Sequence, residues 1–245
     1  MSLLLTAKSA KRFQHYQHLL PRPILRQVLF SSMVKRAVRS DVAAVWRPIV
    51  EAALVDQLEI VVEPKSIIGW LPETMDIKGL EVETKWWFVL PGSWENDARP
   101  FEDHETYAPM RDLVTAPDLK QSPSYLSLIE QQTGGMAPSR VTKVDGTVDG
   151  YFSFYKALAQ KMRETSAVPD FGENDKDRHI GVAVGPNGQL YHHQKGHHRV
   201  MLSKLLHLSE IRVQVRAVHP QWVAGIMRGS KHSYADAIAI GISRL

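Results

Sequence analysis

Cysteine is absent from the 245-residue chain. Its absence excludes disulfide bridges, thiolate metal sites and cysteine nucleophiles, and it agrees with a reducing compartment. The chain is 44% hydrophobic and 23% charged, as is typical of a globular protein long enough to bury a core without covalent cross-links.

Long apolar runs are also missing, since no stretch approaches the roughly 18 residues that a spanning helix needs. The first residues lack the long apolar segment and small-residue cleavage site of a secretory signal. We therefore expect a cytoplasmic protein, with peripheral membrane association as an option.

Acidic residues are absent from residues 1–40, which are basic although the net charge of the whole chain is only +4. Pro21 and Pro23 divide this stretch, so we expect two short amphipathic helices forming a basic arm. Four interpretations stay open: a membrane-surface arm, a polyanion-binding arm, an organelle transit segment, or helices packed on the body with a solvated basic face. The basic residues are Lys8, Lys11, Arg12, Arg22, Arg26, Lys35, Arg36 and Arg39.

The rest of the chain predicts a mixed α/β (α+β) protein. We expect a helix over 41–57 capped by Asp41, a strand over 58–62, and a loop punctuated by Pro64, Gly69 and Pro72. A β-rich stretch follows over 80–90, then irregular chain with short helices over 91–150, a helix over 151–167 and a polar loop over 170–177. The expected divisions are 1–40 (arm), 41–150, 151–223 (the unit that carries chemistry) and 224–245 (tail or helix).

The clearest local pattern begins at Ile180. Apolar residues alternate over 180–184, a Gly-Pro-Asn-Gly turn follows, and residues 189–194 return as a second strand. An amphipathic helix then precedes an alternating strand over 211–217. About sixteen residues separate the last two strands, which predicts a helical crossover between parallel strands.

The turn Lys195-Gly196-His197-His198-Arg199 opens that helix. Free backbone N–H groups and the helix dipole favour an anion at such a place, and glycine allows close approach. Arg199 can grip two phosphate oxygens through its planar fork, and the two histidines add donors. An ordinary helix start with a surface arginine is the competing interpretation.

Together these residues resemble the ParB/sulfiredoxin-like superfamily, whose members carry a Gly-x-x-Arg box here. The resemblance implies a small mixed sheet with flanking helices, here with an N-terminal helical extension, and binding of nucleotide phosphates by residues 195–199. His197 stands where sulfiredoxin has its cysteine, so sulfinic-acid reduction is excluded. Only about 26 residues follow His219, too few for the DNA-binding and dimerisation modules of ParB proteins.

A second resemblance spans residues 90–223 and concerns prokaryotic proteins with a Gly-Arg-His-Arg box. It rests on Gly92-Ser93-Trp94-Glu95, Phe101-Glu102-Asp103 and His219-Pro220-Gln221-Trp222. These proteins look like relatives of the same fold, without an activity that can be carried over.

Phosphoryl transfer needs a carboxylate as base or Mg²⁺ ligand. Glu102 and Asp103 are the candidates, with His198 as a further catalytic group, while Glu95 and Asp97 lie in the same segment. We expect no protein-held metal site at the clustered histidines, because His192 and His193 should face opposite sides of a strand. Trp94 and Trp222 are expected to be core residues, and His219 is either a base or structural.

Three functional hypotheses follow. The first is an ATP- or NTP-dependent phosphotransferase or hydrolase that acts on a small molecule, with Mg²⁺ implied by the resemblance. The second is a nucleotide-regulated module that binds DNA or an anionic membrane through residues 1–40 without catalysis. The third is a ParB-like nuclease, which the lack of a nuclease-type carboxylate cluster disfavours.

Overall fold

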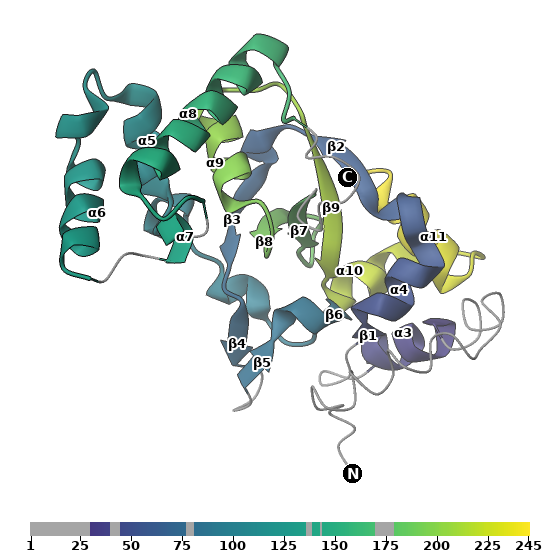
Figure 1. Ribbon diagram of the computed structural model, residues 1–245. Coiled ribbons are helices and arrows are strands. Elements are labelled where there is room, and N and C mark those ends of the chain that lie inside the picture. Colours follow the sequence, from purple (N-terminus) through teal and green to yellow (C-terminus); the bar gives the residue numbers. More distant parts are fainter. Residues whose placement is uncertain (1–29, 40–44, 77–80, 136–138, 143, 170–178) are drawn as a thin grey trace.

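The computed structural model describes residues 30–39, 45–76, 81–135, 139–142, 144–169 and 179–245 (Figure 1). It confirms the expected mixed α/β class, with a seven-stranded mixed sheet and helices on both sides. The sheet combines strands from the expected 41–150 part with strands from the expected 151–223 unit.

The main sheet has the order β1-β6-β9-β7-β8-β3, and β2 pairs with β9 outside this path. The central strand β9 is parallel to β6 and β7 and antiparallel to β2, while β8 is antiparallel to β7 and parallel to β3. Strands β4 and β5 form a separate hairpin-like pair. The bounds are β1 Val45–Trp46, β2 Glu59–Val62, β3 Ile67–Leu71, β4 Thr74–Asp76, β5 Glu81–Glu83, β6 Trp87–Val89, β7 Ile180–Val184, β8 Leu190–His193 and β9 Ile211–Val218.

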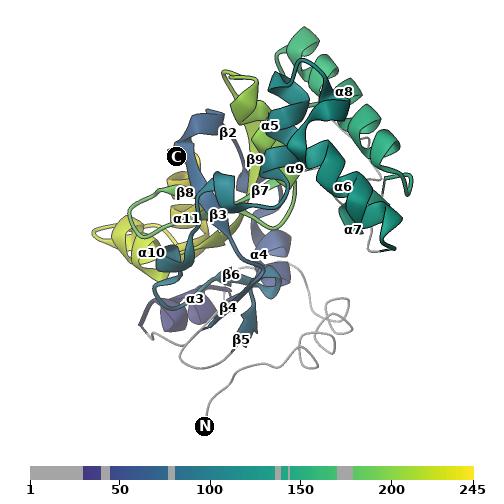
Figure 2. The ribbon, with the colours of Figure 1, turned by 90° about the vertical axis from the view of Figure 1, so that its left-hand side faces the viewer.

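Helices cover the main sheet from two sides (Figures 1 and 2). On one side lie α5 (Tyr107–Thr115), α6 (Pro123–Thr133), α7 (Ser139–Thr142), α8 (Val148–Thr165) and α9 (His197–Leu205). On the other lie α3 (Phe30–Arg39), α4 (Arg47–Leu54), α10 (Pro220–Met227) and α11 (Tyr234–Ile242). One cluster of buried apolar side chains runs through both layers, so the sheet and its helices share a single core.

The hairpin, the following helix and the last strand occur where the sequence predicts them. β7 and β8 pair with Val182 opposite His192, and every residue of β7 is buried. α9 begins directly after Gly196, and β9 spans the alternating stretch.

The expected crossover between parallel strands is wrong in direction. β7 lies between β8 and β9, antiparallel to the first and parallel to the second, so β8 and β9 run in opposite directions. The carboxyl end of β8 and the amino end of β9 therefore lie at the same end of the sheet, on either side of the start of β7. α9 connects these two strand ends. Gly196 still lies between the carboxyl end of a strand and the amino end of a helix.

The expected loop around Gly69 is also wrong, because β3 occupies residues 67–71. The backbone of Trp70 exchanges two hydrogen bonds with that of Arg99, at 2.9 and 3.0 Å. A Cβ on Gly69 would lie 2.7 Å from the Arg99 carbonyl oxygen, so glycine here permits close approach of a second backbone and does not mark a turn.

The helix expected over 41–57 is shorter, since α4 begins only at Arg47. Val45–Trp46 instead extends the sheet by pairing with β6, and residues 55–58 form a 3-10 turn, η2 (Val55–Leu58). The proposed cap Asp41 lies outside the described residues.

Other local expectations are met. Residues 91–150 contain short helices, including η5 (Trp94–Asp97), η6 (Phe101–Asp103) and η7 (Leu119–Gln121). The helix expected over 151–167 is α8, which begins earlier because Thr147 caps it through the Gly150 N–H. The polar loop expected over 170–177 lies outside the described residues.

Of the basic arm, only residues 30–39 are described, and they form α3. Val34 and Ala37 are buried against the body, whereas Lys35, Arg36 and Arg39 are exposed. This part of the arm thus matches the interpretation of a packed helix with a solvated basic face. Within the described residues, no helix combines the length and apolarity required to cross a membrane.

Lys204 on α9 connects the helix to the start of β3. Its Nζ donates to the carbonyl oxygens of Pro64, at 3.0 Å, and Ile67, at 2.8 Å. Burial lowers the pKa of this half-buried lysine, and the charge of Glu102 opposes that shift. Besides these two backbone acceptors, the ammonium group contacts the face of the Phe101 ring, whose centroid is 4.9 Å away.

We predict that Lys204→Met lowers the free energy of unfolding by about 1–3 kcal/mol, because two carbonyl groups lose a charged donor. Urea unfolding measures the change. Lys156→Met, at an exposed position of α8, serves as the control and should stay within about 0.5 kcal/mol of the wild type. Equal stability of the two variants would contradict a structural role for Lys204.

Candidate functional site

The turn between β8 and α9 contains two residues in the left-handed region. Gln194 has a φ of 74° and Gly196 a φ of 88°. A Cβ on Gly196 would lie 3.0 Å from Ile180 Cγ1 and 3.1 Å from Ile180 Cα. Both the φ angle and this contact explain why glycine occupies the position.

The carbonyl oxygen of Lys195 fixes this turn to the sheet. It accepts a hydrogen bond from the Gly181 N–H at 2.9 Å and one from His192 Nε2 at 3.0 Å. Because a carbonyl only accepts, His192 Nε2 must carry the ring proton. These two hydrogen bonds therefore hold the turn beside the first residues of β7.

The N-cap residue of α9 is Gly196, which has no side chain that could accept a backbone N–H. In contrast, α6, α8, α10 and α11 begin with Ser122, Thr147, His219 and Ser233, each of which accepts a backbone N–H. The first helical hydrogen bond of α9 joins the Val200 N–H to the Gly196 carbonyl at 3.0 Å. The N–H groups of residues 197–199 thus precede the helical ladder and present a partial positive charge.

Two cations flank this helix start. The Lys195 side chain is exposed, whereas Arg199 is only 7% exposed. The Arg199 charge acts on Tyr155 of α8, whose pKa burial raises to about 12 against the effect of that charge. Arg199 is thus close to α8, on a buried part of the first turn.

His197 points toward a group of aromatic rings. Its ring centroid lies 4.4 Å from that of His192 and 4.5 Å from that of His104. The ring also donates to the Gln194 carbonyl, while Nδ1 has no hydrogen-bond partner. Burial lowers the pKa of His197 to about 4, with His104 contributing. At neutral pH His197 therefore carries one ring proton, and the hydrogen bond to the Gln194 carbonyl occupies it.

His198 points toward α8. Its Nε2 lies 2.9 Å from the Tyr151 hydroxyl, and its ring stacks on Tyr155 with centroids 4.1 Å apart and planes 13° apart. The expected pair of histidine donors therefore diverges, since His197 and His198 contact different elements. His198 anchors α9 to α8 through its ring.

His192 and His193 face opposite sides of β8, as expected. His192 contacts His197 and Phe101 on the α9 side. With its proton on Nε2, His192 has a buried Nδ1 lone pair without a partner. In the described part of the chain, no three histidine or acidic side chains are arranged to hold a metal ion.

The expected acids Glu102 and Asp103 are both exposed on η6. The charge of Glu102 acts on Lys204, which lies two turns along α9 from the first helical residues. Phe101 and His104 of the same segment do reach the histidines near Gly196. The structure therefore brings this segment beside α9, but the charge of Glu102 acts on Lys204 and not on a residue of the first helical turn.

Buried His219 and Trp94 and the partly exposed Glu95 form a structural group. His219 Nδ1 accepts the Gln221 N–H at 3.1 Å, and its Nε2 donates to the Gly92 carbonyl at 2.8 Å. Glu95 Oε2 lies 3.5 Å from this Nε2. The Trp94 indole donates to the Leu90 carbonyl, and Trp222 is buried. His219 thus caps α10 with both ring nitrogens engaged.

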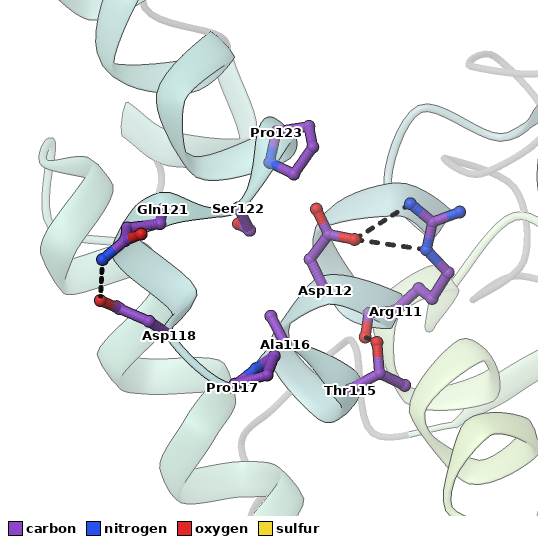
Figure 3. A pocket seen from close by; sticks show the side chains of 9 residues that line it. All are labelled: Arg111, Asp112, Thr115, Ala116, Pro117, Asp118, Gln121, Ser122 and Pro123. Atoms are coloured by element: carbon purple, nitrogen blue, oxygen red, sulfur yellow. Dashed lines mark hydrogen bonds and ion pairs between the residues drawn. The ribbon is translucent and has the colours of Figure 1, made fainter.

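An open hollow of about 510 Å³ lies elsewhere, between α5 and the start of α6 (Figure 3). Its most buried acid is Asp112, which accepts the Ser124 hydroxyl at 2.6 Å, the Ser124 N–H at 3.2 Å and the Arg111 guanidinium at 3.0 Å. Burial raises the pKa of Asp112, but these donors outweigh it and lower the pKa overall. The carboxylate joins α5 to α6, so we assign it a structural role.

Sequence reasoning missed a polar cluster on the α4 side of β8. Arg47 Nη1 donates to Gln194 Oε1 at 2.7 Å, and Gln194 Nε2 lies 2.7 Å from His193 Nε2. Arg216 of β9 reaches the same region. Gly181, a glycine within an otherwise apolar buried strand, is the sequence signal that could have indicated a side chain crossing there.

Comparison with known proteins finds no matching family model, no matching curated protein and no matching solved structure. The resemblance to the ParB/sulfiredoxin-like superfamily therefore stays a prediction.

We predict that stability decreases from about pH 6.5 to pH 5. Burial lowers the pKa values of His192, His193 and His197, that of His193 to about 3 and that of His197 to about 4. Below their ordinary pKa of about 6.5, these residues bind protons only in the unfolded chain. Each should then remove about 1.4 kcal/mol of unfolding free energy per pH unit.

Urea unfolding between pH 8 and pH 5 measures this slope, above the range in which carboxylates titrate. His193→Gln should reduce the slope by about a third, because His192 and His197 still contribute. His232→Gln, at an exposed position, should leave it unchanged. A flat wild-type profile across this range would contradict burial of neutral imidazoles.

Proposed function

We propose that the turn 194–196 and the first turn of α9 bind a phosphate group of a nucleotide. The observation that carries this proposal is the amino end of α9, whose N-cap residue is a glycine in the left-handed region that supplies no side-chain acceptor. Such an end offers several N–H groups to one anion, and the helix dipole adds a favourable field.

Two cations support the assignment. Lys195 adds an exposed positive charge beside the amino end of α9. Arg199 in the first turn adds a second positive charge in a mostly buried setting, where screening is weak. The imidazole ring of His197 contributes little under this proposal, because its ring proton goes to the Gln194 carbonyl, and Nε2 of His198 is engaged by the Tyr151 hydroxyl.

The resemblance to nucleotide-binding members of the ParB-like superfamily supports a nucleotide over a simple phosphate ester. Phosphoryl transfer to a small molecule, or hydrolysis, is the further step that this resemblance implies, with Mg²⁺. It requires a carboxylate at the phosphate. Glu102 and Asp103 are exposed, and Glu102 acts on Lys204, so the geometry favours binding over turnover.

A role of residues 1–40 at a polyanion or an anionic membrane remains a second proposal. Its one support among the described residues is the exposed row Lys35, Arg36 and Arg39 on α3, since an exposed basic face attracts anionic surfaces.

Titration calorimetry with ATP, ADP and CTP, each with and without Mg²⁺, tests the binding proposal. We predict saturable binding that weakens about three- to tenfold in Lys195→Gln, which removes one exposed charge, and more strongly in Gly196→Ala, which displaces the turn. Arg163→Gln, an exposed charge at the end of α8, should leave the affinity unchanged.

Absence of heat with every nucleotide would refute the proposal. So would binding that is equal in the wild type, Lys195→Gln and Gly196→Ala, provided that circular dichroism shows all three to be folded. Loss of γ-phosphate over time, measured separately, decides whether the bound nucleotide is turned over.

A further inference from the structure

The polar cluster on the α4 side of β8 comprises Arg47, His193, Gln194 and Arg216, and we call it the His193 cluster. It collects side chains from α4, β8 and β9. His193 is fully buried, Gln194 is 8% exposed and Arg216 is 6% exposed. The Arg47 side chain is 20% exposed and so connects the cluster to solvent.

The hydrogen bonds of this cluster fix the proton on His193. Arg47 can only donate, so the Gln194 oxygen must be the atom that accepts from it. The Gln194 amide nitrogen then faces His193 and donates to Nε2. A neutral His193 must therefore carry its proton on Nδ1.

The Nδ1–H of His193 is buried and has no partner. An unsatisfied buried donor costs about 1–3 kcal/mol, so such groups are uncommon in folded proteins unless a ligand or water completes them. His193 Nδ1 carries a proton and is a donor, whereas His192 Nδ1, on the other face of β8, is unprotonated. The group that completes it must therefore be an acceptor.

A β-bulge brings Arg216 toward His193. The pairing of β7 with β9 shifts between Val182 and Ala183, which leaves Arg216 as an extra residue on β9. A Cβ on Gly181 would lie 2.6 Å from Arg216 Cδ, so the arginine side chain crosses β7 over this glycine. In the β7–β8 register, Gly181 lies opposite His193.

Two guanidinium groups lie at this cluster. The charges of Arg47 and Arg216 both lower the pKa of His193, so both guanidinium groups lie near its ring. Glu51 is an acidic partner of this region, 2.8 Å from Arg47 Nε on the outer side of α4. A further negative charge at His193 would therefore be attracted by two guanidinium groups.

We propose that the His193 cluster is a second binding site, for a small oxyanion such as a carboxylate or phosphate group, separate from the amino end of α9. The oxyanion accepts the Nδ1–H of His193, and the two arginines supply the balancing charge. Gln194 orients Arg47 and His193 and is a positioning residue.

The experiment follows the His193 ring nitrogens by NMR in the full chain, titrated with sodium acetate and, separately, with sodium phosphate at constant ionic strength. The expected result is a saturable shift of His193 Nδ1 with one or both anions. The tighter anion identifies the class. In Arg47→Gln the affinity should fall about tenfold or more, as expected for loss of a charge-assisted contact.

Arg47→Gln is at a partly exposed position, so it should fold even where a change at buried Arg216 would not. Arg47→Lys should restore part of the affinity, because charge is kept and the planar fork is lost. Arg163→Gln controls for net charge. Lys195→Gln weakens only the α9 site, so the two proposals fail independently.

Unchanged His193 nitrogens with both anions would overturn the proposal. A shift of equal affinity in Arg47→Gln and the wild type would also overturn it, since the cluster would then be a structural contact alone.

Discussion

The Lys195 carbonyl is the contact on which the candidate site depends. It accepts from the Gly181 N–H and from His192, and it thereby ties the β8–α9 turn to the neighbouring strand. With this oxygen fixed, Gln194 and Gly196 remain in left-handed conformations. Gly196 then starts α9 without a cap, and Gln194 reaches between Arg47 and His193. One backbone acceptor thus shapes both the helix start and the His193 cluster.

The two faces of β8 carry opposite hydrogen-bonding chemistry. Adjacent residues of a strand point to opposite sides, and here they are both histidines. His192 donates through Nε2 and leaves a lone pair on the α9 side. His193 accepts through Nε2 and leaves an N–H on the α4 side. The two neutral imidazoles thus have opposite tautomers, and the N–H of His193 lies on the side where Arg47 and Arg216 act on its ring.

The sequence predicts the local elements well and the non-local ones poorly. Alternation and helical spacing are enough for β7, β8, α9 and β9, because each pattern is contained in its own segment. β3 escapes prediction since Gly69 between prolines resembles a loop, and only the distant Arg99 backbone shows why it is glycine. The same holds for the site. The left-handed conformation of Gly196 can be predicted from the sequence, because glycine favours it, whereas nothing local indicates the left-handed conformation of Gln194. The ring partners of His197 and His198 likewise come from segments far along the chain.

Backbone amide shifts of His197, His198 and Arg199 during titration with pyrophosphate test the central claim most directly, because these N–H groups are the proposed anion contacts. Binding at the start of α9 predicts saturable downfield shifts of these amides and of the turn 194–196. If these amides stay unchanged while binding is detected elsewhere, or if no amide shifts at all, the amino end of α9 is a structural helix start and the proposed function is contradicted.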